Sequence, residues 1–517
     1  MYQESLTLSD SLAIQEIQWR ALYGQARIEE KARPEEAIRL LKEAVGIIES
    51  IRSNIRISRL KDGFLSNKLM VYETLCRLLA DSGKPVEAFE MAERSRSRNF
   101  IDLLGSQSFS LDPAMDRRLY DRYHALKERI ETLKQQTIQN TDAEERKRQE
   151  ALLKKAISDL ETVMIEIQAS NPRLSSLVAV EPLRATELQQ MIEPGVALIS
   201  YYMLENELFC WRILPQEIRL FRQKINRKNL EETLLDFRRR IQNLEPFEKP
   251  SHELYDILIK PVLSGMDNIK RLGIIPHGHL HYLSFATLSD GTDFLIDRFP
   301  IFYLPSASVL KYTKEKRISG KNLDVLAIGN PDLGNLNLDL PFSEHEVHSI
   351  QWNFPKITIL TKERATEKWV VDNIDRFGII HLASHGEFDP VNPLLSAIKL
   401  AKEGETDGNL EAAEIFGLKL SADLVVLSAC QTGLGKITAG DDVIGLNRAF
   451  LYAGTHAIIS SLWRVSDIST AMMIKTFYRE YVDKNKAESL RLAALHVKNR
   501  YPHPGYWGAF TLVGDYE

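Results

Sequence analysis

The sequence is poor in cysteine, and neither sign of charge dominates it. Its 517 residues include three cysteines, Cys76, Cys210 and Cys430, and the formal net charge is −5. An odd and sparse cysteine count argues against a disulfide framework and fits a reducing compartment. Because nucleic-acid-binding domains are usually clearly basic, the charge gives no reason to expect direct contact with nucleic acid.

Long apolar runs are missing as well. No stretch approaches the roughly 18 apolar residues that a membrane helix needs, and the first residues show no signal-peptide core. We therefore expect a cytoplasmic protein with no membrane partner. The apolar fraction of 44% is ordinary for a globular chain. The length suits roughly three domains of about 150 residues each.

Residues 1–108 show helical periodicity and a weak internal repeat. A Pro followed by Ala and a large apolar residue occurs at Pro34 and again at Pro85. Proline at the start of a helix is typical of the second helix of a tetratricopeptide pair. We predict partner helices before each copy, around Trp19 and around Tyr72. The opening of the sequence resembles the end of a longer repeat array.

Residues 109–172 are strongly charged and carry a heptad-like pattern. Apolar residues step 4-3-4-3 from Leu119 to Leu133 and again from Leu153 to Ile167. This spacing predicts an antiparallel coiled-coil hairpin that turns near residues 140–142 and ends at Pro172.

From about residue 173 the pattern changes to strands that alternate with helices. Short buried-type runs such as 378–384 and 423–429 are separated by helical segments. The alternation predicts an α/β fold with a mainly parallel sheet and helices on both faces. Functional residues then belong at the C-terminal ends of the strands. We divide this part into an N-terminal lobe, 173–318, and a second lobe, 319–517.

Two of these runs end in residues suited to nucleophilic catalysis. One delivers His385, which Gly386 follows, and the other delivers Cys430, with room for one strand and one helix between them. A thiolate is the nucleophile, and an imidazole nearby lowers its pKa and protonates the leaving amine. The N–H groups of Gly386 and Cys430 would form the oxyanion hole. The alternative is that both side chains only pack in the core.

The next candidates concern a substrate pocket. Asp441 and Asp442 follow Cys430 in the same loop, and Trp463 ends a later strand. An acidic pair could favour Lys or Arg before the scissile bond through charge pairing, although Asp442 also suits the N-cap of the next helix. Trp463 either walls this pocket or packs in the core.

Further histidines and arginines have plainer interpretations. His277, His279 and His281 alternate along a segment that we expect to be extended, but no cysteine or carboxylate cluster completes a zinc site. We expect no metal and no cofactor. His381 should point to the same strand face as His385 and be buried. The arginines at 94, 96 and 98 predict a solvated helix face.

The motifs around the pair resemble a known family. Residues 384–386 and 428–433 are similar to the dyad motifs of caspase-like peptidases. More narrowly, the sequence resembles the CHAT family, caspase-like domains associated with tetratricopeptide repeats. Segments similar to this family are 92–98, 275–285, 445–454, 461–467 and 503–515. The resemblance implies a caspase-like fold, a dyad of His385 and Cys430, and an inactive caspase-like half at 173–318.

We therefore expect a cysteine endopeptidase that cleaves a protein substrate. Repeat helices bind protein segments, so residues 1–108 are predicted to receive an activating regulatory protein or ribonucleoprotein. Bacterial relatives with this layout act in defence against phage, some with CRISPR effectors, and the resemblance implies that context. Two alternatives stay open, a catalytically silent repeat scaffold and a thiol amidase that acts on a small metabolite.

Overall fold

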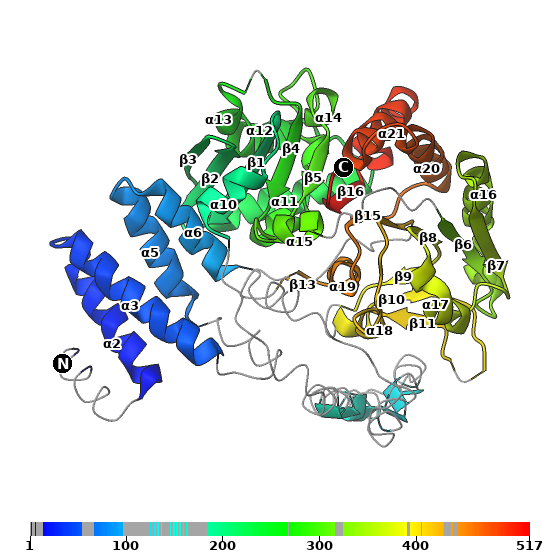
Figure 1. Ribbon diagram of the computed structural model, residues 1–517, viewed down its shortest axis with the longest axis horizontal. Helices are drawn as coiled ribbons and strands as arrows, with labels where there is room; N and C mark the ends of the chain where they lie inside the picture. The colour runs from blue at the N-terminus through cyan, green and yellow to red at the C-terminus, as the bar shows by residue number, and fades with distance from the viewer. Residues whose placement is uncertain are drawn as a thin grey trace.

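A computed structural model describes most of the chain. The described residues are 14–53, 67–96, 183–266, 268–315, 324–389, 393–404, 406–428, 436–437 and 443–517, with short stretches between 2 and 6 and between 122 and 163. A column of helices stands to one side of a larger α/β part (Figure 1). This confirms the predicted fold class of helices followed by an α/β region.

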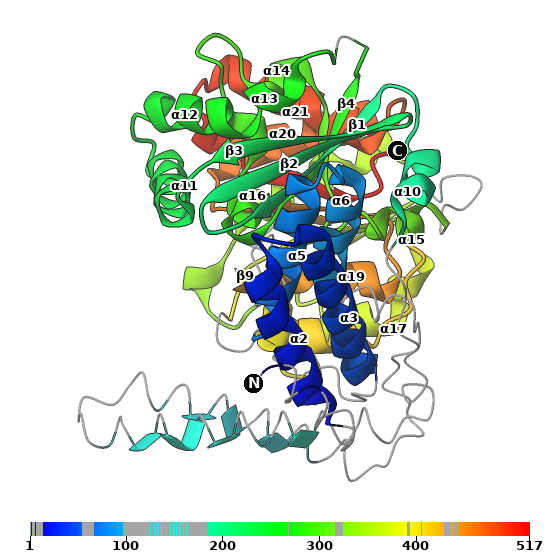
Figure 2. The ribbon, with the colours of Figure 1, turned by 90° about the vertical axis from the view of Figure 1, so that its left-hand side faces the viewer.

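The first part contains two helix pairs, α2 (Gln15–Glu29) with α3 (Pro34–Ser53) and α5 (Leu69–Asp81) with α6 (Pro85–Ser95). Both prolines predicted to begin a second helix do so. The side chains of Trp19 and Tyr72, predicted to lie on the partner helices, are buried. In Figure 2 the four helices form a column, with α6 directly beneath the sheet.

The predicted coiled-coil hairpin falls mostly outside the described residues. Those positions between 122 and 163 that the structure describes are helical. The predicted turn at 140–142 is outside them, so the antiparallel hairpin stays a prediction.

One sheet of eleven strands runs through both predicted lobes. In spatial order these are β3 (Glu217–Lys224), β2 (Glu207–Leu214), β1 (Val196–Met203), β4 (Arg271–Ile275), β5 (Ile301–Tyr303), β16 (Phe510–Gly514), β15 (Ala457–Ser461), β12 (Leu424–Leu427), β8 (Ile379–Ala383), β6 (Val325–Pro331) and β7 (Ile357–Lys362). Strand β16 joins the lobes, because it pairs in parallel with β5 and antiparallel with β15.

The second lobe has a parallel core in the order β15, β12, β8, β6 and β7. Its strands bury both faces. Ile380 and Leu382 of β8 lie in one apolar cluster, and Ile379 and Ala383 lie in another. Buried residues of α16 (Pro341–Ser349), α20 (Asp467–Tyr481) and α21 (Lys486–Arg500) belong to the cluster of Ile379. Those of α17 (Glu367–Asn373), α18 (Ala412–Ile415) and α19 (Leu446–Ala453) belong to the cluster of Ile380. This is the predicted coverage of both faces by helices.

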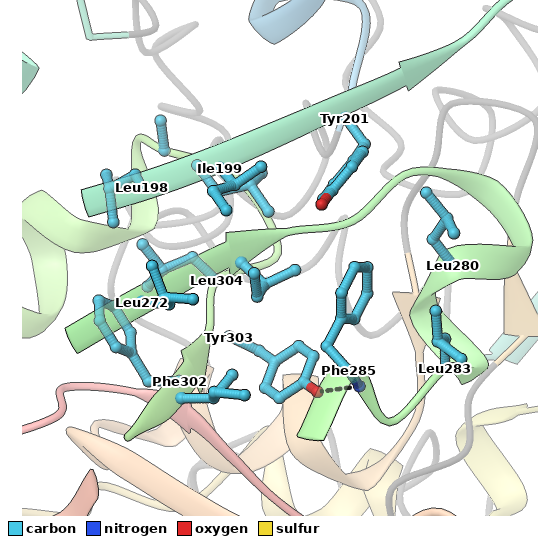
Figure 3. Close-up of a cluster of buried hydrophobic side chains, with 14 of the residues drawn as sticks. Leu198, Ile199, Tyr201, Leu272, Leu280, Leu283, Phe285, Phe302, Tyr303 and Leu304 are labelled. Atoms are coloured by element: carbon cyan, nitrogen blue, oxygen red, sulfur yellow. Dashed lines mark hydrogen bonds between the residues drawn. The ribbon is translucent and has the colours of Figure 1, made fainter. Parts of the chain in front are cut away.

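In the first lobe, β1, β4 and β5 run parallel, while β2 and β3 extend β1 as an antiparallel meander. Figure 3 shows its core, where Tyr201 and Phe285 meet with ring centroids 5.4 Å apart. The hydroxyl of Tyr303 accepts a hydrogen bond from the backbone N–H of Phe285 at 2.9 Å (Figure 3). This bond ties the segment after β4 to β5. The histidines near that segment are not on an extended strand as predicted, since residues 278–282 form a 3₁₀ helix, η1 (Gly278–Tyr282).

The last turn of α6 is built into the first lobe. Arg96 is 0% exposed, which corrects the prediction of a solvated arginine face at this position. Its Nη2 donates to the carbonyl of Tyr201 at 2.7 Å, and its Nε lies 3.3 Å from the carboxylate of Glu93, which is also buried. A buried guanidinium needs such partners, because an unpaired one would carry a large desolvation cost. The helical part is therefore fastened to the sheet through a buried ion pair.

Candidate active site

His385 lies immediately beyond the central strand of the second lobe. Strand β8 is buried along its whole length, and Ser384 separates its last residue from His385. Isoleucine, leucine and alanine side chains of this strand pack on both faces of the sheet. The C-terminal ends of β6, β8 and β12 meet at one edge of the sheet, because the three strands are parallel. His385 thus lies at the edge where ligands of α/β proteins bind.

The imidazole of His385 is oriented by main chain. Its Nε2 lies 2.9 Å from the carbonyl oxygen of Leu338. A carbonyl can only accept, so Nε2 carries the proton and Nδ1 is the basic nitrogen of the neutral ring. The backbone around His385 is also held, because its carbonyl accepts from the N–H of Lys399 at 2.9 Å and the hydroxyl of Ser384 donates to the Lys399 carbonyl. The ring is therefore fixed in tautomer and in position.

The Leu338 carbonyl is itself held by a buried asparagine at the end of β6. Asn330 has a φ of 51°, a left-handed conformation that asparagine tolerates better than most residues. Its Oδ1 accepts from the N–H of Leu340 at 2.7 Å, and its own N–H donates to Ser343 at 3.0 Å. These bonds pin the loop that carries Leu338 across the strand ends.

A small sheet stands directly after His385. Strands β9 (Gly386–Glu387), β10 (Ala397–Lys399) and β11 (Asn409–Glu411) form it in the order β11-β10-β9. With α18 they occupy the space that we predicted for one strand and one helix, so the prediction missed this sheet. Gly386 pairs with Ile398 in the position between two ladder hydrogen bonds, one of which is Lys399 N–H to His385 carbonyl. Antiparallel geometry then turns the N–H of Gly386 away from β10.

The neighbouring strand, β12, leads toward the predicted nucleophile. Its pairing with β8 runs from Leu424 opposite Ile379 to Leu427 opposite Leu382. The next residue, Ser428, donates its N–H to the carbonyl of Leu382 at 2.9 Å. Cys430, Asp441 and Asp442 lie outside the described residues. The structure therefore describes the histidine half of the predicted site and the strand before the cysteine.

Trp463, for which the sequence allows either a pocket wall or core packing, is packed among buried residues. Its indole is buried, and its Nε1 donates to the carbonyl of Gly505 at 3.2 Å. Gly508 packs close by, since a Cβ at this glycine would lie 3.6 Å from the Trp463 ring and would clash with Thr287. These contacts fit the packing role, and a place in the substrate pocket stays a prediction.

The other histidines hold structural positions. His381 is buried on the face of β8 toward α16 and α20, as predicted. Its Nε2 donates to Glu346 at 2.9 Å, and its Nδ1 lies 3.1 Å from the hydroxyl of Tyr478. His277 accepts the N–H of Met203 through Nδ1 at 3.2 Å. Within the described part of the chain, no three His, Cys, Asp or Glu side chains come together as metal ligands would.

Membrane insertion has no candidate helix in the described residues. No helix among these residues is both long enough and apolar enough to cross a bilayer.

The functional features that sequence reasoning missed are all contributions of main chain or of a single amide. The carbonyl of Leu338 and the main chain of Lys399 have no signature in a sequence, because every residue has these groups. Asn330 stands before Pro331 at the end of a strand, which signals a turn but not its role.

Comparison with known proteins places the chain in a family. Residues 248–515, more than half of the chain, match the family model of the CHAT domain. The chain therefore belongs to the CHAT domain family, as its motifs indicated. Strands β1, β2 and β3 precede the matched residues, yet they belong to the same sheet as the matched strands.

Curated relatives carry repeats. The chain is 26% identical over 329 residues to Tetratricopeptide repeat protein 28 of Mus musculus and to the Homo sapiens protein of the same name. The match covers 52% of this chain and only 13% of either relative. The chain therefore matches a small part of these much longer proteins.

Among solved structures, the chain resembles the Saccharomyces cerevisiae separase in its complex with securin. That likeness has a TM-score of 0.45 at 10% identity and covers 99% of this chain and 48% of the other. The complex of the pro- and mature domains of Porphyromonas gingivalis RgpB gives a TM-score of 0.37 at 14% identity, over 56% of this chain and 77% of that chain. Likenesses at this level do not establish a shared activity.

Proposed function

We propose that this CHAT-domain chain is a cysteine endopeptidase with Cys430 as nucleophile and His385 as its acid–base partner. One observation carries the proposal. The offset between paired residues of β12 and β8 is constant from Leu424–Ile379 to Leu427–Leu382, and the offset between Cys430 and His385 is the same. If this pairing continued for three more residues, Cys430 would lie opposite His385.

The chemistry follows from the orientation of His385. Because Nε2–H is bound to the Leu338 carbonyl, Nδ1 is the nitrogen that accepts the proton of the Cys430 thiol. The thiolate attacks the scissile carbonyl carbon, and the C–N bond breaks as Nδ1–H delivers this proton to the leaving amine. Nδ1 then takes a proton from water as the water oxygen attacks the thioester carbonyl carbon. The C–S bond breaks, the proton passes to the sulfur, and the acyl half leaves as a carboxylic acid. The Leu338 carbonyl stabilises the imidazolium that forms between these steps.

Gly386 supports the same reaction as a donor to the oxyanion. Its N–H faces away from β10, so the small sheet does not consume it. We propose the N–H of Cys430 as the second donor, which would hold the negative oxygen between the two strand ends. Asp441 and Asp442 remain predictions for a pocket that favours Lys or Arg before the scissile bond.

Regulation through the helical part is the second element of the proposal. An activating protein or ribonucleoprotein would bind the helices of residues 1–108, and these helices are attached to the sheet. The support for this is the buried pair of Glu93 and Arg96, whose bonds to Tyr201 and Ala307 reach β1 and the segment that follows β5. A role in bacterial defence stays a prediction of the family resemblance.

The test is to incubate the wild-type chain with the products of neighbouring genes, with and without candidate activators, and to sequence new N-termini. We expect cleavage by the wild type and none by Cys430→Ala or His385→Ala. Ser428→Ala, two residues before Cys430, is the matched control. Cleavage that survives Cys430→Ala would exclude the thiol as nucleophile, and binding of a partner without cleavage under any condition would favour the silent scaffold.

A further inference from the structure

Large apolar side chains are exposed on the loop between β6 and α16, whose Leu338 carbonyl binds His385, and on the first turn of α16. Leu336 is 92% exposed, Leu338 is 40% exposed and Phe342 is 50% exposed. We call these three side chains the apolar rim. Exposed loop positions usually carry polar residues. A local group of exposed large apolar side chains therefore indicates a surface that binds a ligand or another protein.

The rim is held firmly, which distinguishes it from a loose loop. Asn330 accepts the N–H of Leu340 between Leu338 and Phe342, and Lys362 pairs with Asp339. Hydrogen bonds from the side chains of Lys362 and Asn330, together with the charge of Lys362, keep the pKa of Asp339 below its usual value. The apolar side chains therefore stand on a backbone whose position is fixed on both sides.

The place of the rim follows from two observations. The carbonyl of Leu338 binds the imidazole of His385, so the rim adjoins the group that must protonate the leaving amine. The strand order β12-β8-β6 puts the rim on the side of His385 away from β12, the strand that leads to Cys430. During cleavage the acyl half of the substrate is attached to the cysteine, and the amine half leaves next to the histidine.

From this arrangement we infer that the apolar rim binds the side chain of the residue immediately after the scissile bond, and that this residue is a large apolar one such as Leu, Ile, Met or Phe. The inference rests on the proposed peptidase function and adds the substrate class on the leaving side. It is separate from the acidic pair predicted for the residue before the bond.

The first experiment reads this residue directly, because it becomes the new N-terminus. The full-length chain, with activator where one is found, digests a mixture of unfolded proteins, and all new N-termini are sequenced. We expect large apolar residues there. In Leu336→Ser/Phe342→Ser the apolar products should fall about tenfold relative to the others, as loss of apolar pocket contacts does in other enzymes. Trp352→Ser is the control, because Trp352 is 86% exposed and lies beyond the other end of α16.

A second experiment does not need turnover. The full-length Cys430→Ala chain is irradiated with a pool of short peptides that carry photo-leucine at one fixed position and random residues elsewhere, and the adducts are mapped. We expect adducts on residues 332–342, reduced several-fold in Leu336→Ser/Phe342→Ser and unchanged in Trp352→Ser. Circular dichroism checks that each variant is folded. We expect all of them to fold, because the substituted side chains are exposed.

The outcomes separate this inference from the peptidase proposal. Cleavage without an apolar preference at the new N-terminus, or with the same preference in Leu336→Ser/Phe342→Ser, overturns the rim assignment and leaves the peptidase intact. Adducts distributed over the surface, or equally dense at Trp352, also overturn it. Adducts confined to the apolar rim support the rim as the binding site for apolar side chains. This result holds even if the chain cleaves nothing, an outcome that counts against the peptidase proposal alone.

Discussion

The imidazole of His385 and the main-chain carbonyl of Leu338 are 2.9 Å apart, and this bond decides which ring nitrogen can act as a base. Leu338 reaches this position because Asn330 fixes the loop that follows β6. A catalytic proposal for this chain therefore depends on three neighbouring strand ends, those of β6, β8 and β12.

Asn330→Ala should loosen the loop that carries Leu338. The change removes the acceptor for the Leu340 N–H and puts alanine at a φ of 51°, so we expect a loss of about 1–3 kcal/mol in the free energy of unfolding. Turnover should fall as well, because His385 loses its orientation. Urea unfolding and cleavage rates measure the two effects. Asn337→Ala, exposed on the same loop, should change neither, and equal effects at both positions would contradict the role of Asn330.

Arg238 links the lobes near the candidate site. From α11 (Arg227–Gln242) its Nη2 donates to the carbonyl of Leu462 just after β15 at 3.0 Å, and burial lowers the pKa of its guanidinium. Arg238→Met should cost about 1.5–3 kcal/mol, the usual range for a hydrogen bond from a charged group. The control is Arg239→Met on the same helix, since Arg239 makes surface ion pairs with Asp236 and Glu245. A surface pair contributes less than about 1 kcal/mol, so similar losses in both variants would argue against the link.

The ion pair of Glu93 and Arg96 should be the strongest attachment of the helical part. Arg96→Met leaves the Glu93 carboxylate buried without its charge partner, which typically costs about 3–5 kcal/mol. Glu93→Gln/Arg96→Met should recover part of that loss, because no uncompensated charge remains. Thermal unfolding of the full chain measures both of these variants and Glu93→Gln alone. If the double variant is as unstable as the sum of the singles, the two groups are not coupled.

Asp423 should make stability depend on acid pH. Burial alone would raise its pKa, but hydrogen bonds from His456 and Tyr481 and the charge of Lys486 outweigh burial and hold the pKa well below the usual value. A carboxyl whose pKa is lowered by folding stabilises the protein above its unfolded pKa near 4, and this contribution is lost as the pH falls toward the folded value.

We therefore expect Asp423→Asn to lose about 2 kcal/mol or more at pH 7, because it leaves Lys486 buried with a weaker partner. The gap between wild type and variant should narrow below about pH 4. Urea unfolding between pH 7 and pH 3 tests this. Asp483→Asn is the control, an acidic residue just beyond α20, and its stability difference should stay small at every pH. A gap that is constant with pH would contradict the assignment to Asp423.

Some features of this protein are determined by its sequence alone. The apolar runs that end at His385 and before Cys430, the prolines that begin α3 and α6, and the CHAT motifs are local patterns, and local patterns predict strands, helix starts and family membership. Only the tertiary structure decided what those residues meet. The buried place of Arg96, the packing of Trp463 against Gly505 and the carbonyl of Leu338 at His385 join residues between 42 and 105 positions apart. Main-chain groups are the same in every residue and burial depends on distant packing, so neither can be read along the chain.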